Sequence, residues 1–85
     1  MLRETVENNL GQVLRNYRRD PRRRVSLRDL GSEVDMSYVA IWRREQPPSH
    51  PDHVRMSNSE LLELCAAIER IVERRAAELS PADVL

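Results

Sequence analysis

The positions of five prolines constrain the fold of this 85-residue chain more than any other feature of its sequence. Proline interrupts a helix because it lacks a backbone N–H, and it also pushes the preceding residue out of the helical conformation. Pro21 therefore ends a first helix, residues 46–58 with three prolines form a loop, and Pro81 ends the last segment. This spacing leaves three stretches free to form helices, at residues 5–19, 26–45 and 59–79.

Apolar residues recur at helical spacing in the first and last of these stretches, which predicts an amphipathic helix in each. In the first stretch they are Val6, Leu10, Val13, Leu14 and Tyr17. In the last they are Leu61, Leu64, Cys65, Ile68, Ile71, Val72 and Leu79. Ser57 and Glu60 have the spacing of a capping box for that helix, which at 1.5 Å per residue is about 31 Å long.

The middle stretch, residues 26–45, predicts two short helices joined by a tight turn. Ser26 and Ser37 are good N-caps for them, because a serine hydroxyl accepts a hydrogen bond from a free backbone N–H of the first turn. Asp35 occupies the turn and belongs to the few residue types that tolerate left-handed backbone. Gly31 costs about 1 kcal/mol within a helix, so we expect the second helix to approach closely there.

This middle stretch resembles the helix-turn-helix of the XRE, or lambda repressor- and Cro-like, family, and it matches the family pattern without a gap. The matching positions are Leu30, Val34, Met36, Ser37, Ile41 and Glu45. Upstream they are Leu10, Gly11, Val13, Leu14 and Arg18, and downstream Leu61, Leu62, Leu64 and Ile68. The resemblance implies an all-α domain of four to five helices with an extended C-terminal helix.

Several residues depart from the family pattern. Gly31 and Asp35 replace a small alanine and a turn glycine, and both are physically acceptable. Leu27 replaces a glutamine that often contacts DNA, so Arg28 is the candidate to take over that contact. Arg44 replaces an apolar residue, and we expect it to be a surface charge or an ion-pair partner. Trp42 replaces a small polar residue, and packing and DNA contact remain alternatives for it.

The resemblance implies a transcriptional regulator similar to small phage repressors, which binds operator DNA through a recognition helix at residues 37–45. The candidate DNA-binding residues are Arg22, Arg23, Arg24, Arg28, Ser37, Tyr38, Val39, Trp42 and Arg43. Arg22, Arg23 and Arg24 precede the first of the two short helices, where they would form either a clamp for phosphate or a solvated charged loop. Val39 would meet a thymine methyl group, and Arg43 would reach guanine or phosphate.

The charges divide along the chain although they sum to zero. Residues 1–44 hold ten arginines and six acids, a net charge of +4, and residues 45–85 hold four arginines and eight acids, a net charge of −4. Such a division is expected when one half of a protein faces an anion such as DNA. All fourteen basic residues are arginine, for which codon bias is the favoured explanation and a need for bidentate contacts to phosphate or guanine is the alternative.

A second copy of the chain is the expected partner for the long helix. A chain this short buries only about 60% of its unfolded surface, and the last turns of the helix have nothing left in the chain to cover them. The residues predicted to contact the second copy are Ile68, Ile71, Val72 and Leu79. A homodimer would place two recognition helices in successive major grooves of a palindromic operator.

The remaining residues indicate little chemistry. The single cysteine, Cys65, excludes an internal disulfide, and His50 and His53 lack partners with metal-ligand spacing. We therefore expect no enzyme activity, no cofactor or metal, no small-molecule ligand and no membrane span, in a cytoplasmic protein. The alternative function is a protein-interaction module on the same fold, such as an antitoxin or anti-repressor, which would use Tyr38, Trp42 and the long helix to hold another protein.

Overall fold

The computed structural model describes residues 10–78, which form an all-α structure, as predicted. Its helices are α2 (Leu10–Arg19), α3 (Leu27–Val34), α4 (Tyr38–Glu45) and α5 (Asn58–Glu78). The predicted helices at 5–19 and 59–79 correspond to α2 and α5, although residues 5–9 and 79 lie outside the described residues. The proline-rich loop ends at residue 57, one residue earlier than expected.

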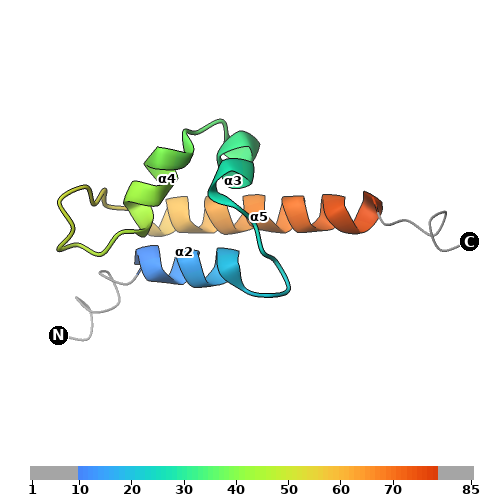
Figure 1. Ribbon diagram of the computed structural model, residues 1–85, viewed down its shortest axis with the longest axis horizontal. Helices are drawn as coiled ribbons and strands as arrows, with labels where there is room; N and C mark the ends of the chain where they lie inside the picture. Colours follow the sequence, from blue (N-terminus) through green and yellow to red (C-terminus); the bar gives the residue numbers. More distant parts are fainter. Residues whose placement is uncertain (1–9, 79–85) are drawn as a thin grey trace, which may run out of the picture.

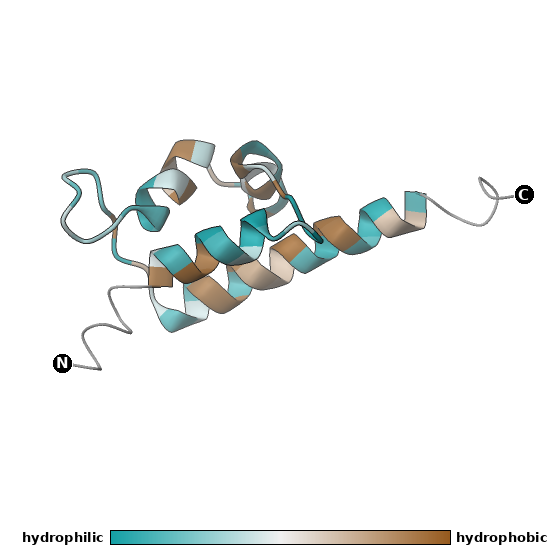
Figure 2. Cartoon of the chain, turned by 60° about the horizontal axis from the view of Figure 1, so that its bottom comes forward, coloured by the Kyte–Doolittle hydropathy of each residue, from teal (hydrophilic) through white to brown (hydrophobic). Residues whose placement is uncertain are grey.

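The helices form two layers. Helix α5 runs along the length of the molecule with α2 beside it, and α3 and α4 cover one side of this pair (Figure 1). Figure 2 shows hydrophobic residues recurring along α2 and α5, whereas residues 46–57 are mostly hydrophilic. Each of the two layers therefore presents an apolar face to the other, which is the arrangement that amphipathic helices require.

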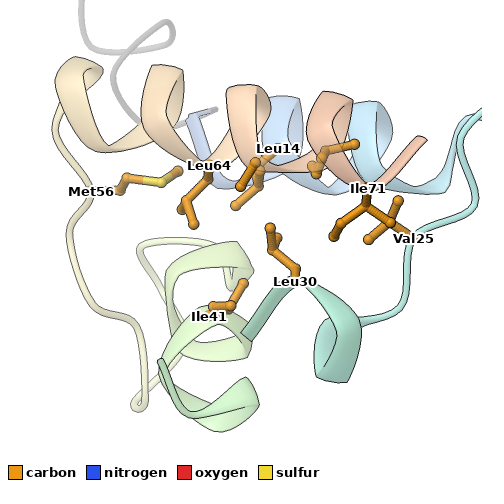
Figure 3. Close-up of a cluster of buried hydrophobic side chains, with 9 residues drawn as sticks. Leu14, Val25, Leu30, Ile41, Met56, Leu64 and Ile71 are labelled. Atoms are coloured by element: carbon orange, nitrogen blue, oxygen red, sulfur yellow. The ribbon is translucent and has the colours of Figure 1, made fainter. Parts of the chain in front are cut away.

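The core lies between the two layers and draws on every helix (Figure 3). Its buried residues are Leu14, Val25, Leu30, Ile41, Met56, Leu64, Ala67, Ile68 and Ile71. The fully buried residues include Leu30 and Ile41, from the layer of α3 and α4, and Leu14 and Ile68, from the layer of α2 and α5. Val13 was predicted to face inward with them, but it is 46% exposed, whereas the next residue, Leu14, is fully buried.

The prediction that Ile68 and Ile71 contact a second copy was wrong. Ile68 is fully buried and Ile71 is 6% exposed, since both pack into the core of their own chain. Val72 packs partly against that core as well, and Leu79 lies outside the described residues. The later turns of α5 also form ion pairs within the chain, because Arg70 and Arg74 both pair with Glu33 of α3.

Close backbone contacts explain both glycines. A Cβ atom on Gly31 would lie 2.5 Å from the carbonyl oxygen of Met36, so the predicted close approach is confirmed. A Cβ atom on Gly11 would overlap the carbonyl oxygen of Arg44, which places α2 directly against the end of α4. No helix within residues 10–78 is both long and apolar enough to cross a membrane.

Candidate nucleic-acid interface

Local hydrogen bonds fix the turn between α3 and α4. Ser26 caps α3 by accepting a hydrogen bond from the N–H of Asp29 at 3.0 Å, and Ser37 caps α4 by accepting one from Val39 at 3.2 Å. Asp35 ends α3 in the left-handed conformation, with φ 54° and ψ 50°, as its residue type predicts. Only residues 35–37 separate the two helices, so the turn is as tight as expected.

A buried ion pair holds the C-terminal end of α4. Arg18 of α2 donates two hydrogen bonds of 2.8 Å to the carboxylate of Glu45, and a third, of 3.0 Å, to the carbonyl of Val25. The Glu45 side chain is only 1% exposed, and Arg15 approaches it at 3.6 Å. The sequence marks Arg18 and Glu45 separately as matching positions, and the structure brings them together. Bidentate geometry fixes both the position and the orientation of a carboxylate.

The side of α4 that faces away from the core carries three of the predicted DNA-binding residues. Tyr38 is 43% exposed, Val39 is 37% exposed, and Arg43 is exposed. The guanidinium carbon of Arg28 lies 4.8 Å above the centre of the Tyr38 ring, so the first turns of α3 and α4 meet at this pair. We call these four residues the α4 face. Ser37 adjoins it, and its hydroxyl can still donate a hydrogen bond while it caps the helix.

Trp42 packs against the proline-rich loop. Its ring is half-buried and meets the edge of His50 at a centroid distance of 5.4 Å. Arg44, the other uncertain position of α4, pairs with Glu60 at 3.3 Å and donates to the carbonyl of Ala40. Arg44 is therefore an ion-pair partner, which is one of the two roles expected for it.

The structure separates the three arginines of the predicted phosphate clamp. Arg22 has a side chain that is 91% exposed, with only a long contact of 3.6 Å to Asp20, and Arg24 is also exposed. Arg23 instead donates to Glu69 of α5 at 2.8 Å and stacks over the ring of Tyr17 at 3.7 Å. The guanidinium of Arg23 is thus partly occupied within the chain, which leaves Arg22 and Arg24 as the more available arms of the predicted clamp; phosphate contact by all three stays a prediction.

The charge division seen along the sequence is largely cancelled in space. Acids of the second half pair with arginines of the first, as Glu45, Glu60 and Glu69 do with Arg18, Arg44 and Arg23. Conversely, Asp29 and Glu33 pair with arginines of α5. Within residues 10–78, the arginines without an ion pair are Arg19, Arg24, Arg28, Arg43 and Arg55, and the corresponding acids are Asp35, Asp52, Glu63, Glu73 and Glu78.

These unpaired charges are sorted between the two layers. Three of the five acids lie on α5. Of the five arginines, Arg24, Arg28 and Arg43 lie before α3, on α3 and on α4, whereas Arg19 ends α2 and Arg55 lies in the loop before α5. Asp35 in the turn and Asp52 in the proline-rich loop are the unpaired acids outside α5. The layer of α3 and α4 therefore carries the excess of available positive charge, although the chain as a whole is neutral.

Both histidines form hydrogen bonds to the backbone of the proline-rich loop. The Nδ1 atom of His50 accepts a hydrogen bond from the N–H of Asp52, and that of His53 lies 2.8 Å from the carbonyl oxygen of Gln46. Among residues 10–78, no group of three or more potential ligands could hold a metal ion. What the layer of α3 and α4 offers are exposed cationic and aromatic side chains.

Comparison with known proteins gives no relative: no family model, no curated protein and no solved structure matches this chain.

Proposed function

We propose that this chain is a sequence-specific double-stranded DNA-binding regulator, in which α3, its turn and α4 form a helix-turn-helix of the lambda-repressor type. The observation that carries the proposal is the α4 face, where Arg28, Tyr38, Val39 and Arg43 are exposed on two helices that the turn holds together. An eight-residue helix is about 12 Å long, which suits entry into a major groove about 12 Å wide.

Each side chain of the α4 face has a chemically suitable contact on a duplex. Val39 offers an apolar surface to a thymine methyl group, and Arg43 offers parallel donors to guanine or phosphate. The stacked Arg28 and Tyr38 would donate to backbone phosphates, which fix the register of a protein on DNA. The excess of unpaired arginines in the layer of α3 and α4 supports this orientation, because phosphate contacts dominate affinity.

The regulator would act as a homodimer on a palindromic operator and repress by occluding a promoter, in the cytoplasm of a bacterium or a phage-infected host. Two recognition helices on successive major grooves lie about 34 Å apart. Sedimentation of the chain alone and on operator DNA tests this part. A single copy per operator in both measurements would remove the homodimer while leaving DNA binding intact.

Selection from a pool of random duplexes, followed by gel shift on the recovered sequence, tests the proposal itself. We expect an enriched sequence with two inverted half-sites and an affinity that falls steeply with salt. Failure to enrich any sequence, together with no shift of duplex DNA at low salt, would refute DNA binding.

Two matched variants locate the interface. Val39→Glu places a carboxylate on the α4 face, and Val13→Glu places the same group on an exposed valine of α2. We expect Val39→Glu to weaken binding at least about tenfold, the equivalent of about 1.4 kcal/mol, because it removes an apolar contact and repels phosphate. Val13→Glu should bind as the unaltered chain does. Equal effects of the two variants would show that α4 is not the contacting helix.

The second candidate function is a protein-interaction module. Tyr38 and Val39 lie side by side in the sequence as exposed large hydrophobic residues, and such residues are common in contacts between proteins. A partner protein captured from lysate through these residues, combined with salt-insensitive or absent binding to DNA, would favour this alternative.

A further inference from the structure

The arginine loop (residues 20–25) between α2 and α3 is anchored by α5, a helix distant from it in the sequence. The Nη1 atom of Arg75 donates to the carbonyl oxygens of Arg23, at 2.8 Å, and of Arg24, at 3.1 Å. Its Nη2 atom lies 3.2 Å from the carboxylate of Asp29 in the first turn of α3. The planar, forked guanidinium reaches these three acceptors with two different nitrogens held in a fixed geometry.

The backbone of the arginine loop is also closed upon itself. The N–H groups of Arg23 and Arg24 both donate to the carbonyl oxygen of Asp20, and the N–H of Val25 donates to that of Arg18. Arg24 adopts a left-handed conformation with φ 46°, which is unfavourable for a residue with a Cβ atom. Such a conformation persists only where surrounding contacts hold it, and the bond from Arg75 to the Arg24 carbonyl is one of these contacts.

The side chain of Arg23 forms a second anchor. It donates to Glu69, one and a half turns before Arg75 on α5, and lies over the ring of Tyr17 on α2. The loop is therefore tied to α5 through its backbone and through its central side chain. What it presents outward are the exposed side chains of Arg22 and Arg24, on either side of that anchor.

We infer that the arginine loop is a rigid two-armed phosphate clamp, with Arg22 and Arg24 as its arms and Arg75 of α5 as the positioning residue that sets their geometry. The inference rests on the proposed function, since the phosphates are those of the duplex that α4 contacts. Arg28 of the α4 face lies in the first turn of α3, the helix that directly follows the arginine loop, and we therefore place the clamped phosphates beside the groove that α4 enters. Arg75 itself touches no DNA.

The salt dependence of binding to the selected duplex tests the clamp. Each phosphate contact contributes about 0.9 to the slope of log affinity against log salt. Losing both arms in an Arg22→Ala, Arg24→Ala double variant should therefore lower the slope by about 1.8. Between about 50 and 200 mM salt, the affinity would then fall about 12-fold less than that of the unaltered chain. Arg75→Gln should also make the slope shallower, although Arg22 and Arg24 are both still present, because they are no longer held in position.

Arg74→Gln is the matched control. Arg74 is the next residue of α5 and pairs with Glu33 of α3 at 2.6 Å, but it does not contact the arginine loop. Arg74→Gln should leave the salt slope unchanged. In the Arg22→Ala, Arg24→Ala double variant, which we call the variant without arms, adding Arg75→Gln should have no further effect on the slope. Hydrogen exchange of the backbone amides of residues 23–25 should accelerate in Arg75→Gln but not in Arg74→Gln. This measurement reports the loss of loop order without DNA.

The outcomes separate this inference from the proposed function. No duplex binding by the unaltered chain overturns both. Duplex binding with an unchanged slope in the variant without arms overturns the clamp alone. A normal slope and normal amide exchange in folded Arg75→Gln, or an effect that simply adds to the loss of the arms, overturns the positioning role of Arg75.

Discussion

Replacing Glu45 with glutamine is the substitution that most directly tests how α4 is held. Glu45→Gln keeps the shape of the side chain but leaves the buried guanidinium of Arg18 without a counter-charge, since Arg18 is only 9% exposed. Removing one partner of a buried ion pair costs about 3–5 kcal/mol. A small domain has a total stability near the lower end of about 5–15 kcal/mol, so the variant should be close to unfolded.

Urea denaturation followed by far-ultraviolet circular dichroism measures this cost. With a slope of about 1 kcal/mol per molar urea, the midpoint should fall by about 3 M, or the variant should be unfolded without denaturant. Salt should change the difference little, because the pair is shielded from water. Arg18→Met combined with Glu45→Leu should recover much of the loss, since replacing a whole buried pair by apolar residues is often neutral.

The recovery should be incomplete, because the Val25 carbonyl also loses the hydrogen bond that Arg18 donates. A loss below about 1 kcal/mol in Glu45→Gln, or a double variant less stable than either single one, would refute the view that α4 is held by this pair.

Three further predictions follow from single contacts. Gly31→Ala should destabilise the fold by about 1–3 kcal/mol in the same denaturation assay, because its Cβ would meet the Met36 carbonyl, while Ser32→Ala at the next, exposed position should not. Ser57→Ala should cost about 1 kcal/mol, because Ser57 and Glu60 form the predicted capping box in both directions; a Ser59→Ala control should cost less. The free energy of unfolding should be lower in acid than at neutral pH, because hydrogen bonds from Arg74 and Arg70 lower the pKa of Glu33. That contribution is complete above the ordinary pKa of 4.5 and is lost as the pH falls through the lowered pKa, so Glu33→Gln should show a shallower loss of stability in acid.

The local features of the fold could be predicted from the sequence because neighbouring residues decide them. The caps at Ser26, Ser37 and Ser57 and the left-handed turn at Asp35 all depend on residues within four positions of one another. Proline placement set the helix ends for the same reason. The exposed position of Tyr38, Val39 and Arg43 also followed from helical periodicity once Ile41 was taken as the inward residue.

The differences between expectation and structure all concern residues whose surroundings come from distant parts of the chain. Val13 and Ile68 both lie on apolar stripes, but the packing of the helices leaves the first exposed and buries the second in the core. Arg23 looks like its neighbours in the sequence, but Tyr17 and Glu69 meet over it in space. No pattern in the sequence pointed to Arg75, which interrupts an apolar stripe and is, in the structure, the anchor of a loop 51 residues away.

By itself the sequence determined that helices form within residues 10–78, where α2 ends, where α3 and α4 begin and end, where α5 begins, and which side of α4 avoids the core. These properties follow from hydrogen bonds and periodicity within a few residues. Tertiary structure alone decided which arginines are free. With fourteen arginines and fourteen acids in the chain, the sequence allows many pairings, and only the packing of α2, α3 and α4 against α5 selects those that form.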